Sequence, residues 1–357
     1  MEKYSRWADL TTGINPFVPH KQRFAGNIAL KGVQFLGGTA LALVRLPLVA
    51  VVGVVLAATT LVTAILSFVP LLGRLLKRLT EWLLCSLLLL LLGVFVSEEQ
   101  ANTRRLGLSA PGAKVSGGSD RVRRRDVIVC NHTGFLEVLV LAKRYSPVFV
   151  FVPVDGGSKG LVHTCGVLGA LYHAFAAPVG SGNIEDVVKR ASGPVVVFPE
   201  GARSNGKSVL RFVPVLQQLP LALDKSSPLR VHLIAFRYEF KNFSPSQSAG
   251  GGWRHYFWTS FHLYHSLKVT VLGAKSLSLS DSAKPGSTPA TTLTNAQVER
   301  FRSLLAAMLR TKTIDMGVDD FVSFNAYWAH VTSGGRKPAA EFTDRKAPHE
   351  HAQWAKK

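Results

Sequence analysis

The chain has 357 residues, a formal net charge of +20 and three cysteines. Three cysteines without a C-x-x-C pair exclude a disulfide framework and indicate free thiols in a reducing compartment. The excess of cations indicates an anionic partner. Because no nucleic-acid-binding motif is present, we expect membrane phosphate or a phosphorylated substrate, and no nucleic acid.

The longest apolar stretch lies near the N-terminus. Residues 1–34 are polar and mildly basic, and residues 35–96 are mostly apolar. Residues 46–72 carry no charge. This uncharged run is longer than the about 20 residues that a membrane-spanning helix needs. A second uncharged run covers residues 82–96. The pattern predicts a membrane-embedded helical hairpin; one span followed by a flat helix, or a hairpin buried in a soluble protein, are the alternatives.

The distribution of Lys and Arg predicts the orientation of this hairpin. There are 6 of these residues in 1–45 and 7 in 97–126, against 3 in the intervening loop at 73–81. Because cations concentrate on the cytoplasmic side of a membrane, both flanks are expected in the cytoplasm, including the N-terminal segment 1–34. The arginines within residues 121–125 would attract anionic lipid.

The rest of the chain has the pattern of an α/β fold. Residues 97–120, rich in Gly, Ser and Ala, predict a connector to a main domain at 121–275. Strands that alternate with helices predict an α/β sheet. The strands are expected at 126–130, 147–152, from 195, 229–236 and 267–272, and the helices at 135–144, 159–173 and 184–190.

The C-terminal part is expected to be a linker plus a helical region over residues 276–332. Residues 276–294 are rich in Ser, Thr, Pro and Ala, which indicates a loop. Thr294 or Asn295 is a suitable N-cap for a helix that ends near Arg310. The polar residues 333–357 predict a mobile tail.

Residues 195–212 combine a β-branched strand with a glycine-rich, cationic turn. After Pro199 come Glu200, Gly201, Arg203 and Lys207, which together with backbone N–H groups suit a phosphate. Residues 201–208 also match the P-loop pattern G-x-x-x-x-G-K-[ST] of nucleotide hydrolases. A P-loop needs a helix that begins at the lysine, whereas the segment that follows is short and contains a proline.

A second motif lies upstream, where Asn131-His132-Thr133-Gly134-Phe135-Leu136-Glu137 follows a strand and opens a helix. A histidine in the turn and a carboxylate one turn into the helix can meet side chain to side chain. The carboxylate would then fix the tautomer of the imidazole and stabilise its protonated form. This spacing therefore predicts that His132 is a general base.

The two motifs together resemble the glycerol-3-phosphate/lysophospholipid acyltransferase family, whose blocks are Asn-His-x-x-x-x-Asp and Phe-Pro-Glu-Gly-Thr-Arg-Ser. Here the second block is Phe-Pro-Glu-Gly-Ala-Arg-Ser at 198–204. Residues 1–7 and 12–17 further resemble the fungal lysophosphatidic acid acyltransferases of the endoplasmic reticulum and lipid droplets. The resemblance implies a mixed sheet flanked by helices. It also implies a location at the endoplasmic reticulum membrane, at lipid droplets or at both, with the catalytic domain facing the cytoplasm.

The resemblance also implies roles for individual residues. His132 would deprotonate the hydroxyl of a lysophospholipid, and this oxygen would attack the thioester of acyl-CoA, with Glu137 orienting His132. Acyl-CoA is a co-substrate, and neither a cofactor nor a metal is implied. The residues implied in substrate binding are Asn131, Glu200, Gly201, Arg203 and Lys207, of which Lys207 would add to the phosphate site or meet the phosphates of CoA.

Two departures from the family pattern leave an alternative open. Glu137 stands in place of the usual Asp, and Ala202 in place of the usual Thr. A non-catalytic membrane adapter that keeps the acyltransferase fold is therefore the rival hypothesis. The aromatic stretch 253–265 contains three histidines, but no acid or cysteine completes a metal site. We expect it to pack as core, to lie at the membrane interface or to line an acyl-chain tunnel.

Overall fold

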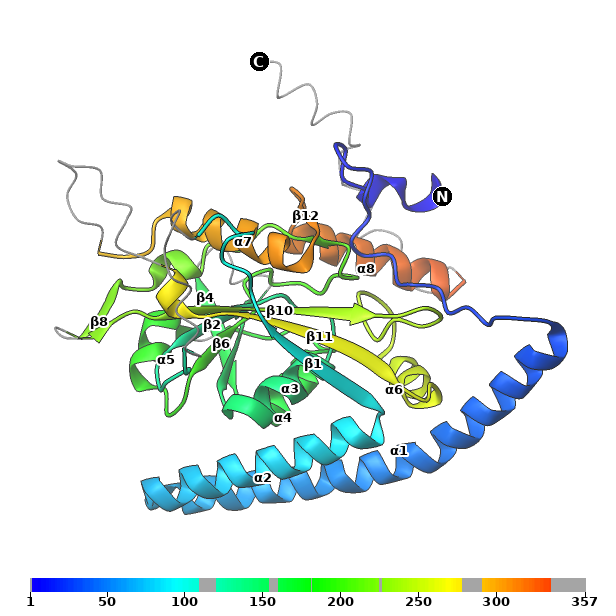
Figure 1. Cartoon of the computed structure of the whole chain (residues 1–357), viewed down its shortest axis with the longest axis horizontal. Coiled ribbons are helices and arrows are strands. Elements are labelled where there is room, and N and C mark those ends of the chain that lie inside the picture. Colours follow the sequence, from blue (N-terminus) through cyan, green and yellow to red (C-terminus); the bar gives the residue numbers. More distant parts are fainter. Residues whose placement is uncertain are drawn as a thin grey trace.

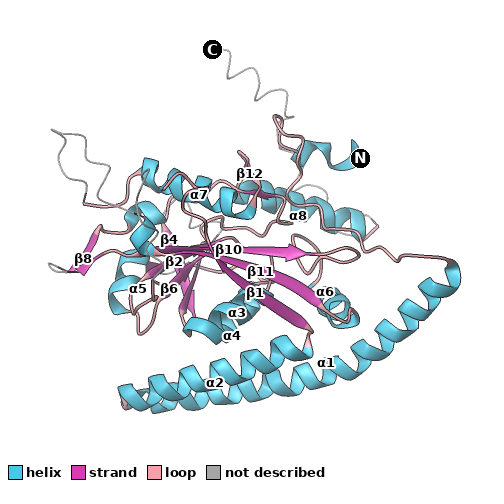
Figure 2. Cartoon of the chain, in the orientation of Figure 1, coloured by secondary structure: helices cyan, strands magenta, loops and turns pink. Residues whose placement is uncertain are grey.

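The computed structural model describes residues 2–108, 120–153, 160–180, 182–224, 227–277 and 291–334. It shows a mixed α/β fold in which helices flank a central sheet, with a long apolar helix near the N-terminus (Figures 1 and 2). This arrangement confirms the predicted α/β class with a mixed sheet.

The central sheet has eight strands in the order β1-β11-β10-β2-β6-β3-β4-β5. The neighbours β10, β2, β6 and β3 run parallel, whereas β11, β4 and β5 introduce antiparallel pairs. Two small sheets pair β12 with β7 and β8 with β9. The strands are β1 Val94–Gln100, β2 Val127–Cys130, β3 Val148–Phe151, β4 Leu161–Cys165, β5 Gly182–Asn183, β6 Val195–Val197, β7 Ser208–Val209, β8 Ala222–Asp224, β9 Ser227–Pro228, β10 Val231–Glu239, β11 His265–Leu272 and β12 Lys312–Thr313.

Eight α-helices are described, together with short 3-10 turns. The α-helices are α1 Ile28–Ile65, α2 Pro70–Leu91, α3 Leu136–Tyr145, α4 Val167–His173, α5 Ile184–Arg190, α6 Gly252–Phe261, α7 Asn295–Leu309 and α8 Val318–Thr332. The 3-10 turns are η1 Glu2–Trp7, η2 Leu66–Phe68, η3 Leu216–Gln218 and η4 Ala274–Ser276. The predicted helix at 184–190 and the helix that follows Thr294 are both confirmed, the latter with a complete capping box.

The parallel centre of the sheet is buried on both faces, which explains its continuous apolar runs. Side chains along β2 alternate between the faces. Val127 and Val129 belong to the cluster that contains α5 and α7, and Ile128 and Cys130 to the cluster that contains α2, α3 and α4. The sheet is therefore held between two apolar layers, and its carboxyl edge is rigidly placed.

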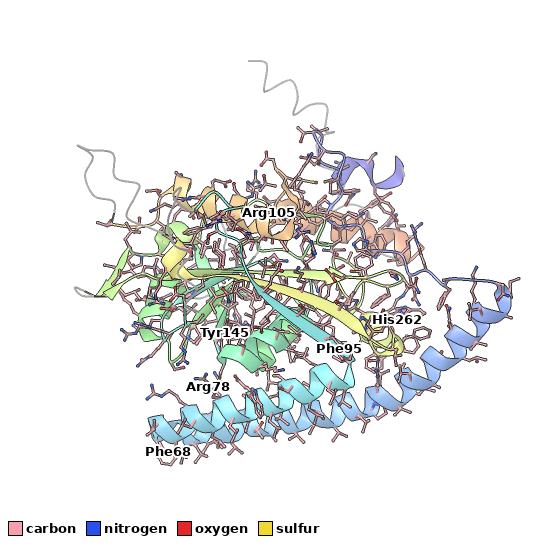
Figure 3. All side chains as sticks on the ribbon, viewed as in Figure 1. Phe68, Arg78, Phe95, Arg105, Tyr145 and His262 are labelled. Atoms are coloured by element: carbon pink, nitrogen blue, oxygen red, sulfur yellow. The ribbon has the colours of Figure 1, made fainter. Side chains whose placement is uncertain are left out.

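Helices α1 and α2 form a hairpin along one side of the α/β part (Figure 1). Phe68 lies at its tip and is 75% exposed (Figure 3). Helix α2 packs on α3, and α1 packs on α6, where Arg45 donates to the carbonyl oxygens of His262 at 2.7 Å and Leu263 at 3.0 Å. Large apolar side chains of the hairpin remain exposed on its other side. Among the described residues, only α1 is long and apolar enough to cross a membrane.

Two segments differ from their predicted structure. The second hairpin helix was expected to extend to residue 96 and a connector to follow it, but the helix ends at Leu91 and β1 covers Val94–Gln100. Short apolar runs fit a buried strand and a helix equally well, and pairing with β11 decides in favour of the strand. Likewise, the first half of the predicted helix at 159–173 is the strand β4. The tail from residue 335, and residues 109–119 and 278–290 of the predicted connector and linker, lie outside the described residues.

The N-terminal segment packs against helix α8, which the sequence did not predict. Trp7 is 2% exposed and Phe17 is fully buried. Their rings contact Phe324 at centroid distances of 5.5 and 5.7 Å. Single aromatics in a polar stretch show no periodicity, so their burial has no signature in the local sequence. The two ends of the described chain therefore form one aromatic cluster next to the α/β sheet.

Candidate active site

The two sequence motifs meet at the carboxyl edge of the sheet. Strands β2 and β6 are parallel neighbours, with Val129 opposite Val197, so the loops that follow them leave the sheet side by side. The carbonyl oxygen of His132 accepts a hydrogen bond from the backbone N–H of Ser204 at 3.1 Å. Open α/β sheets place ligands at this edge.

His132 and Glu137 form the expected pair. The Nδ1 atom of His132 lies 3.3 Å from Oε2 of Glu137. The same oxygen accepts from the N–H groups of Thr133 at 3.1 Å and Gly134 at 2.9 Å, and Oε1 accepts from the hydroxyls of Thr133 and Tyr238. Glu137 is fully buried at the N-terminus of α3, where backbone donors favour a carboxylate. The longer side chain of Glu therefore reaches His132 and is held by several donors.

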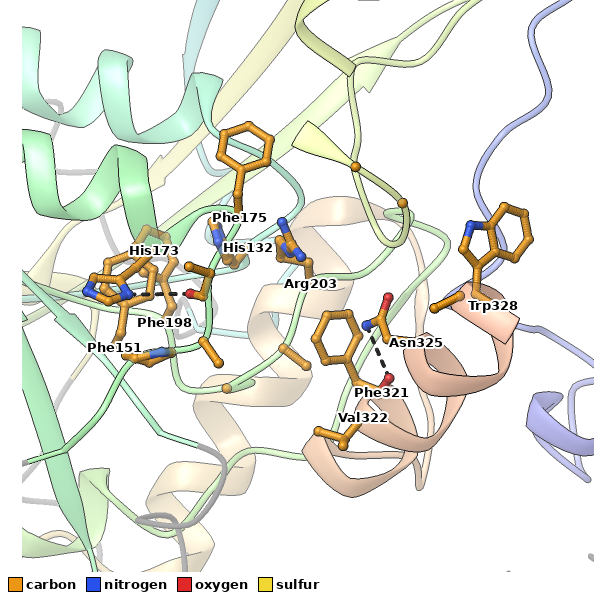
Figure 4. A pocket seen from close by; sticks show the side chains of 18 of the residues that line it. His132, Phe151, His173, Phe175, Phe198, Arg203, Phe321, Val322, Asn325 and Trp328 are labelled. Carbon is orange, nitrogen blue, oxygen red and sulfur yellow. Dashed lines mark hydrogen bonds between the residues drawn. The ribbon is translucent and has the colours of Figure 1, made fainter. Parts of the chain in front are cut away.

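The other nitrogen of His132 faces a cavity. The imidazole ring packs on Phe198 and Phe151, with centroid distances of 4.4 and 5.7 Å. Nε2 is buried and has no hydrogen-bond partner among the described residues, and the ring lines a cavity of about 620 Å³ (Figure 4). When Nδ1–H donates to Glu137, Nε2 carries a free lone pair and can accept a proton.

Arg203 lines the same cavity (Figure 4). Its guanidinium donates to the carbonyl oxygen of Ala174 and lies 6.0 Å from the ring of Phe175 and 5.8 Å from that of Phe321. Burial lowers the pKa of Arg203 to about 10, so the group stays charged at neutral pH. No described carboxylate forms a salt bridge with it, and none of the described residues that line the cavity is acidic. A partly buried cation without an acidic partner among the described residues suits an anionic ligand.

Gly201 also lines the cavity, and its backbone explains the residue type. Its φ is +61°, in the left-handed region, and a Cβ there would approach the side chain of Val213 to 3.1 Å. Helix α8 forms the opposite wall of the cavity with Phe321, Asn325 and Trp328 (Figure 4). Helix α8 lies within the helical region predicted for residues 276–332, but its role as a wall of the cavity was not predicted.

Three of the predicted binding residues do not line this cavity. The side-chain amide of Asn131 exchanges two hydrogen bonds with the backbone of Phe236, at 3.0 and 2.8 Å, and so extends the pairing of β2 with β10. Glu200 is fully buried and accepts from the N–H of Leu210 at 3.0 Å. Lys207 is exposed, and its charge acts on His20. The structure thus brings His132, Glu137, Gly201 and Arg203 together.

The buried carboxyl of Glu200 predicts a pH-dependent stability. Burial raises its pKa from 4.5 to about 8, against the backbone donors and Arg302 that lower it. Because the folded form then holds a proton that the unfolded form loses, stability falls as the pH rises from 4.5 to about 8, by at most about 1.4 kcal/mol per pH unit. We expect Glu200→Gln to remove this slope.

The measurement is urea unfolding of both proteins between pH 5 and pH 9. Glu185→Gln is the matched control, because the side chain of Glu185 on α5 is 38% exposed and forms a salt bridge with Lys189 at the surface. Parallel pH profiles of wild type and Glu200→Gln would contradict the assignment of the slope to Glu200.

The P-loop hypothesis is contradicted by the structure. Strand β7 follows Lys207 directly, where a P-loop requires a helix. The N–H groups of Gly206 and Lys207 already donate to the side chains of Ser204 and Asn205. A nucleotide phosphate would therefore find neither a helix terminus nor free amides there.

The aromatic stretch packs only in part, because Phe261 is buried whereas Trp253 and Tyr264 are 77% and 62% exposed. Residues 253–261 belong to α6, which contacts α1, and Phe261 is 4% exposed. Among the described residues, no group of three metal-ligating side chains comes together. Burial lowers the pKa of His255 to about 4, so this imidazole is neutral at physiological pH.

Comparison with known proteins gives one match. No family model matches the chain, and no solved structure matches it significantly. A protein of Schizosaccharomyces pombe that is provisionally named lysophosphatidic acid:oleoyl-CoA acyltransferase is 28% identical over 224 residues. The match covers 60% of this chain and 67% of that protein. This similarity supports acyltransferase activity at the level of the class.

Proposed function

We propose that the protein is a membrane-bound acyltransferase that moves a fatty acyl group from acyl-CoA to the free hydroxyl of lysophosphatidic acid or a close lysophospholipid. The observation that carries this proposal is a single cavity lined by both His132 and Arg203. Nε2 of His132 is buried there without a hydrogen-bond partner among the described residues, and the guanidinium of Arg203 has no described carboxylate as its partner. A proton acceptor and an anion site in one cavity suit a phosphorylated alcohol.

The side chains suggest a direct transfer. Nε2 of His132 takes the proton of the acceptor hydroxyl while the hydroxyl oxygen attacks the carbonyl carbon of the thioester. The resulting tetrahedral centre collapses, the C–S bond breaks, and the CoA sulfur leaves with the proton returned by His132. Glu137, bonded to Nδ1, stabilises the imidazolium between these steps. The products are an ester and free CoA thiol.

Arg203 is proposed to bind the phosphate of the acceptor. The planar guanidinium can donate two parallel hydrogen bonds to phosphate oxygens, and it is partly shielded from solvent. Because it lines the cavity with His132, a phosphate bound to it would hold the glycerol hydroxyl close to Nε2. Glu200 and Asn131 would support this arrangement from behind the cavity rather than touch the substrate.

An apolar cavity next to the site supports a lipid substrate. It has a volume of about 250 Å³ and lies between the hairpin and the helices α3, α4 and α6. Phe135 and Tyr256 line it, and Tyr256 contacts Phe175 of the His132 cavity at 4.9 Å. One lining residue of each cavity thus contacts a lining residue of the other, and we infer that an acyl chain extends from the site towards the hairpin and the bilayer.

The test is acyl transfer from oleoyl-CoA by the purified protein to a panel of lysophospholipids that differ in head group. The proposal expects the highest kcat/KM with lysophosphatidic acid, because its exposed phosphate monoester fits Arg203 best. A choline or ethanolamine head group should lower kcat/KM. Folded protein without activity on any acceptor would refute the proposal and favour the non-catalytic adapter.

The exposed face of the hairpin predicts how the protein attaches to membranes. Val54 and Leu61 are 69% and 64% exposed on α1. Each buried side chain of this size contributes about 1.5–3 kcal/mol of transfer free energy, so Val54→Asp with Leu61→Asp should weaken vesicle binding by at least about 100-fold. Flotation with phosphatidylcholine vesicles measures this.

The matched control is Leu10→Asp, because Leu10 is 67% exposed but lies in the N-terminal segment outside the hairpin. It should float like the wild type. Equal flotation of the double variant and the wild type would show that this face of the hairpin does not enter the bilayer.

A further inference from the structure

We propose that a second polar cavity, between the N-terminal segment and α6, binds the pantetheine and phosphate part of acyl-CoA. This cavity has a volume of about 470 Å³ and is lined by residues 19–22 and Phe24, by the loop before α6 and by α6 itself. The inference rests on the proposed function, since that function makes acyl-CoA the donor, and it adds the place where the donor binds.

The position of this cavity suits the donor. It shares Gly250, Gly251 and Trp328 with the His132 cavity, so the two spaces adjoin. The glycines leave the border open: a Cβ at Gly251 would meet nothing within 4 Å, and one at Gly250 only the indole of Trp328 at 3.7 Å. A long ligand with its thioester at His132 can therefore continue through this border into the second cavity.

Two unsatisfied polar atoms in the lining match an amide-rich ligand. Oε1 of Gln247 and Nε2 of Gln22 are buried and have no hydrogen-bond partner among the described residues. Gln247 is itself only 3% exposed, and its backbone N–H donates to Thr133, beside His132, at 2.7 Å. One unpaired acceptor and one unpaired donor call for a ligand that offers both N–H and C=O, as the two amides of pantetheine do.

The charges around the cavity suit phosphate. Lys21 and Arg254 are exposed residues that line it, and the charge of Lys207 acts on His20 in the same wall. None of the described residues that line the cavity is acidic. The phosphates of CoA would therefore meet cations here. Of the two roles expected for Lys207, this position suits binding of the phosphates of CoA rather than of the phosphate of the acceptor.

The N-terminal segment is fixed to the loop that carries Arg203. The side-chain amide of Asn205 donates to the carbonyl oxygens of Asn15 at 3.0 Å and Val18 at 2.9 Å. Nε2 of His20 lies 3.0 Å from the carbonyl oxygen of Asn205. The wall of the proposed donor site is thus fixed by contacts two residues from Arg203, so the N-terminal segment would contribute to donor binding as well as to packing.

The test compares the wild type with two variants, Gln247→Leu and the double variant Lys21→Glu with Arg254→Glu. For each we measure kcat, KM for oleoyl-CoA, KM for lysophosphatidic acid, and the Kd of CoA by calorimetry. We expect KM for oleoyl-CoA and the Kd of CoA to rise by about 10- to 100-fold, with kcat and the acceptor KM within about twofold. Arg300→Glu, an exposed charge reversal on α7 away from the cavities, should match the wild type.

The outcomes separate this inference from the proposed function. Active protein whose donor KM is unchanged in both variants would overturn the donor site and leave the function standing. An inactive wild type that binds CoA, with a raised Kd in the variants, would support the site and refute the function. A wild type that neither turns over nor binds CoA would overturn both. Since Lys21 and Arg254 are exposed, the double variant should fold.

Discussion

The His132→Ala variant is expected to lose acyl transfer almost completely, with kcat lowered by about 10³-fold. General-base catalysis contributes on this scale, and no other described residue in the cavity presents a buried, unpartnered imidazole nitrogen. The loss should fall on kcat, because the proposed mechanism assigns binding of the acceptor to Arg203 and proton transfer to His132. The measurement is steady-state kinetics with oleoyl-CoA and lysophosphatidic acid.

The control for this variant is His163→Ala. His163 is a partly exposed histidine of β4 whose Nδ1 contacts the carbonyl oxygen of Val179; its ring packs on His173 at 4.4 Å, but His163 itself does not line the cavity. It should keep full activity. His132→Gln preserves a polar side chain of similar size and should be as inactive as His132→Ala. Activity within about tenfold of wild type in both His132 variants would show that another group takes the proton.

The Arg203→Ala variant is expected to raise KM for lysophosphatidic acid by about 10- to 100-fold. Charge-assisted hydrogen bonds to a buried ion contribute about 1.5–3 kcal/mol, which corresponds to this range. Arg203→Lys should recover little, because a lysine cannot donate two parallel hydrogen bonds or stack between Phe175 and Phe321. The KM for oleoyl-CoA should change far less than that for the acceptor.

Arg190→Ala is the matched control, since Arg190 is an exposed arginine at the end of α5 and lines neither cavity. An Arg203→Ala variant with an unchanged acceptor KM and a raised donor KM would mean that Arg203 binds CoA instead. That result would assign CoA to the cavity lined by Arg203 and the acceptor to the cavity beside the N-terminal segment. The role of His132 as the general base would be unaffected.

The sequence predicted the elements that carry their own local signal. The buried strands β2, β3 and β6 are short β-branched or aromatic runs, and α7 begins with a capping box at Thr294. β1 and β4 were not predicted, because their short runs become strands only through pairing with β11 and β3. The structure of these two segments depends on tertiary contacts, which a local sequence pattern does not predict.

The residues of the candidate site also differ in whether the local sequence predicts their positions. The spacing of His132 and Glu137 made their contact predictable, since both lie on one strand–turn–helix unit. The sequence also identified Arg203, but it placed Glu200 in the same phosphate site and Lys207 there or at the phosphates of CoA, whereas Glu200 is fully buried and Lys207 is exposed. The hydroxyl of Tyr238, which donates to Glu137, comes from β10 and had no sequence signal.

The residues that build the second half of the site are the least predictable. Helix α8 and the N-terminal segment lie at opposite ends of the chain and meet through Trp7, Phe17 and Phe324. Their contact depends on the closed fold and not on any repeat in the sequence. The same holds for Gln22 and Gln247, whose unpaired atoms appear only when the N-terminal segment covers the loop before α6.

The most direct test of the central claim is acyl transfer from oleoyl-CoA to lysophosphatidic acid by wild type and His132→Ala in parallel, with the diacyl product and the free CoA thiol quantified in each reaction. We expect equal amounts of both products from the wild type, and about 10³-fold slower formation of both by folded His132→Ala. Thiol released without diacyl product, or equal rates in the two proteins, would contradict the central claim.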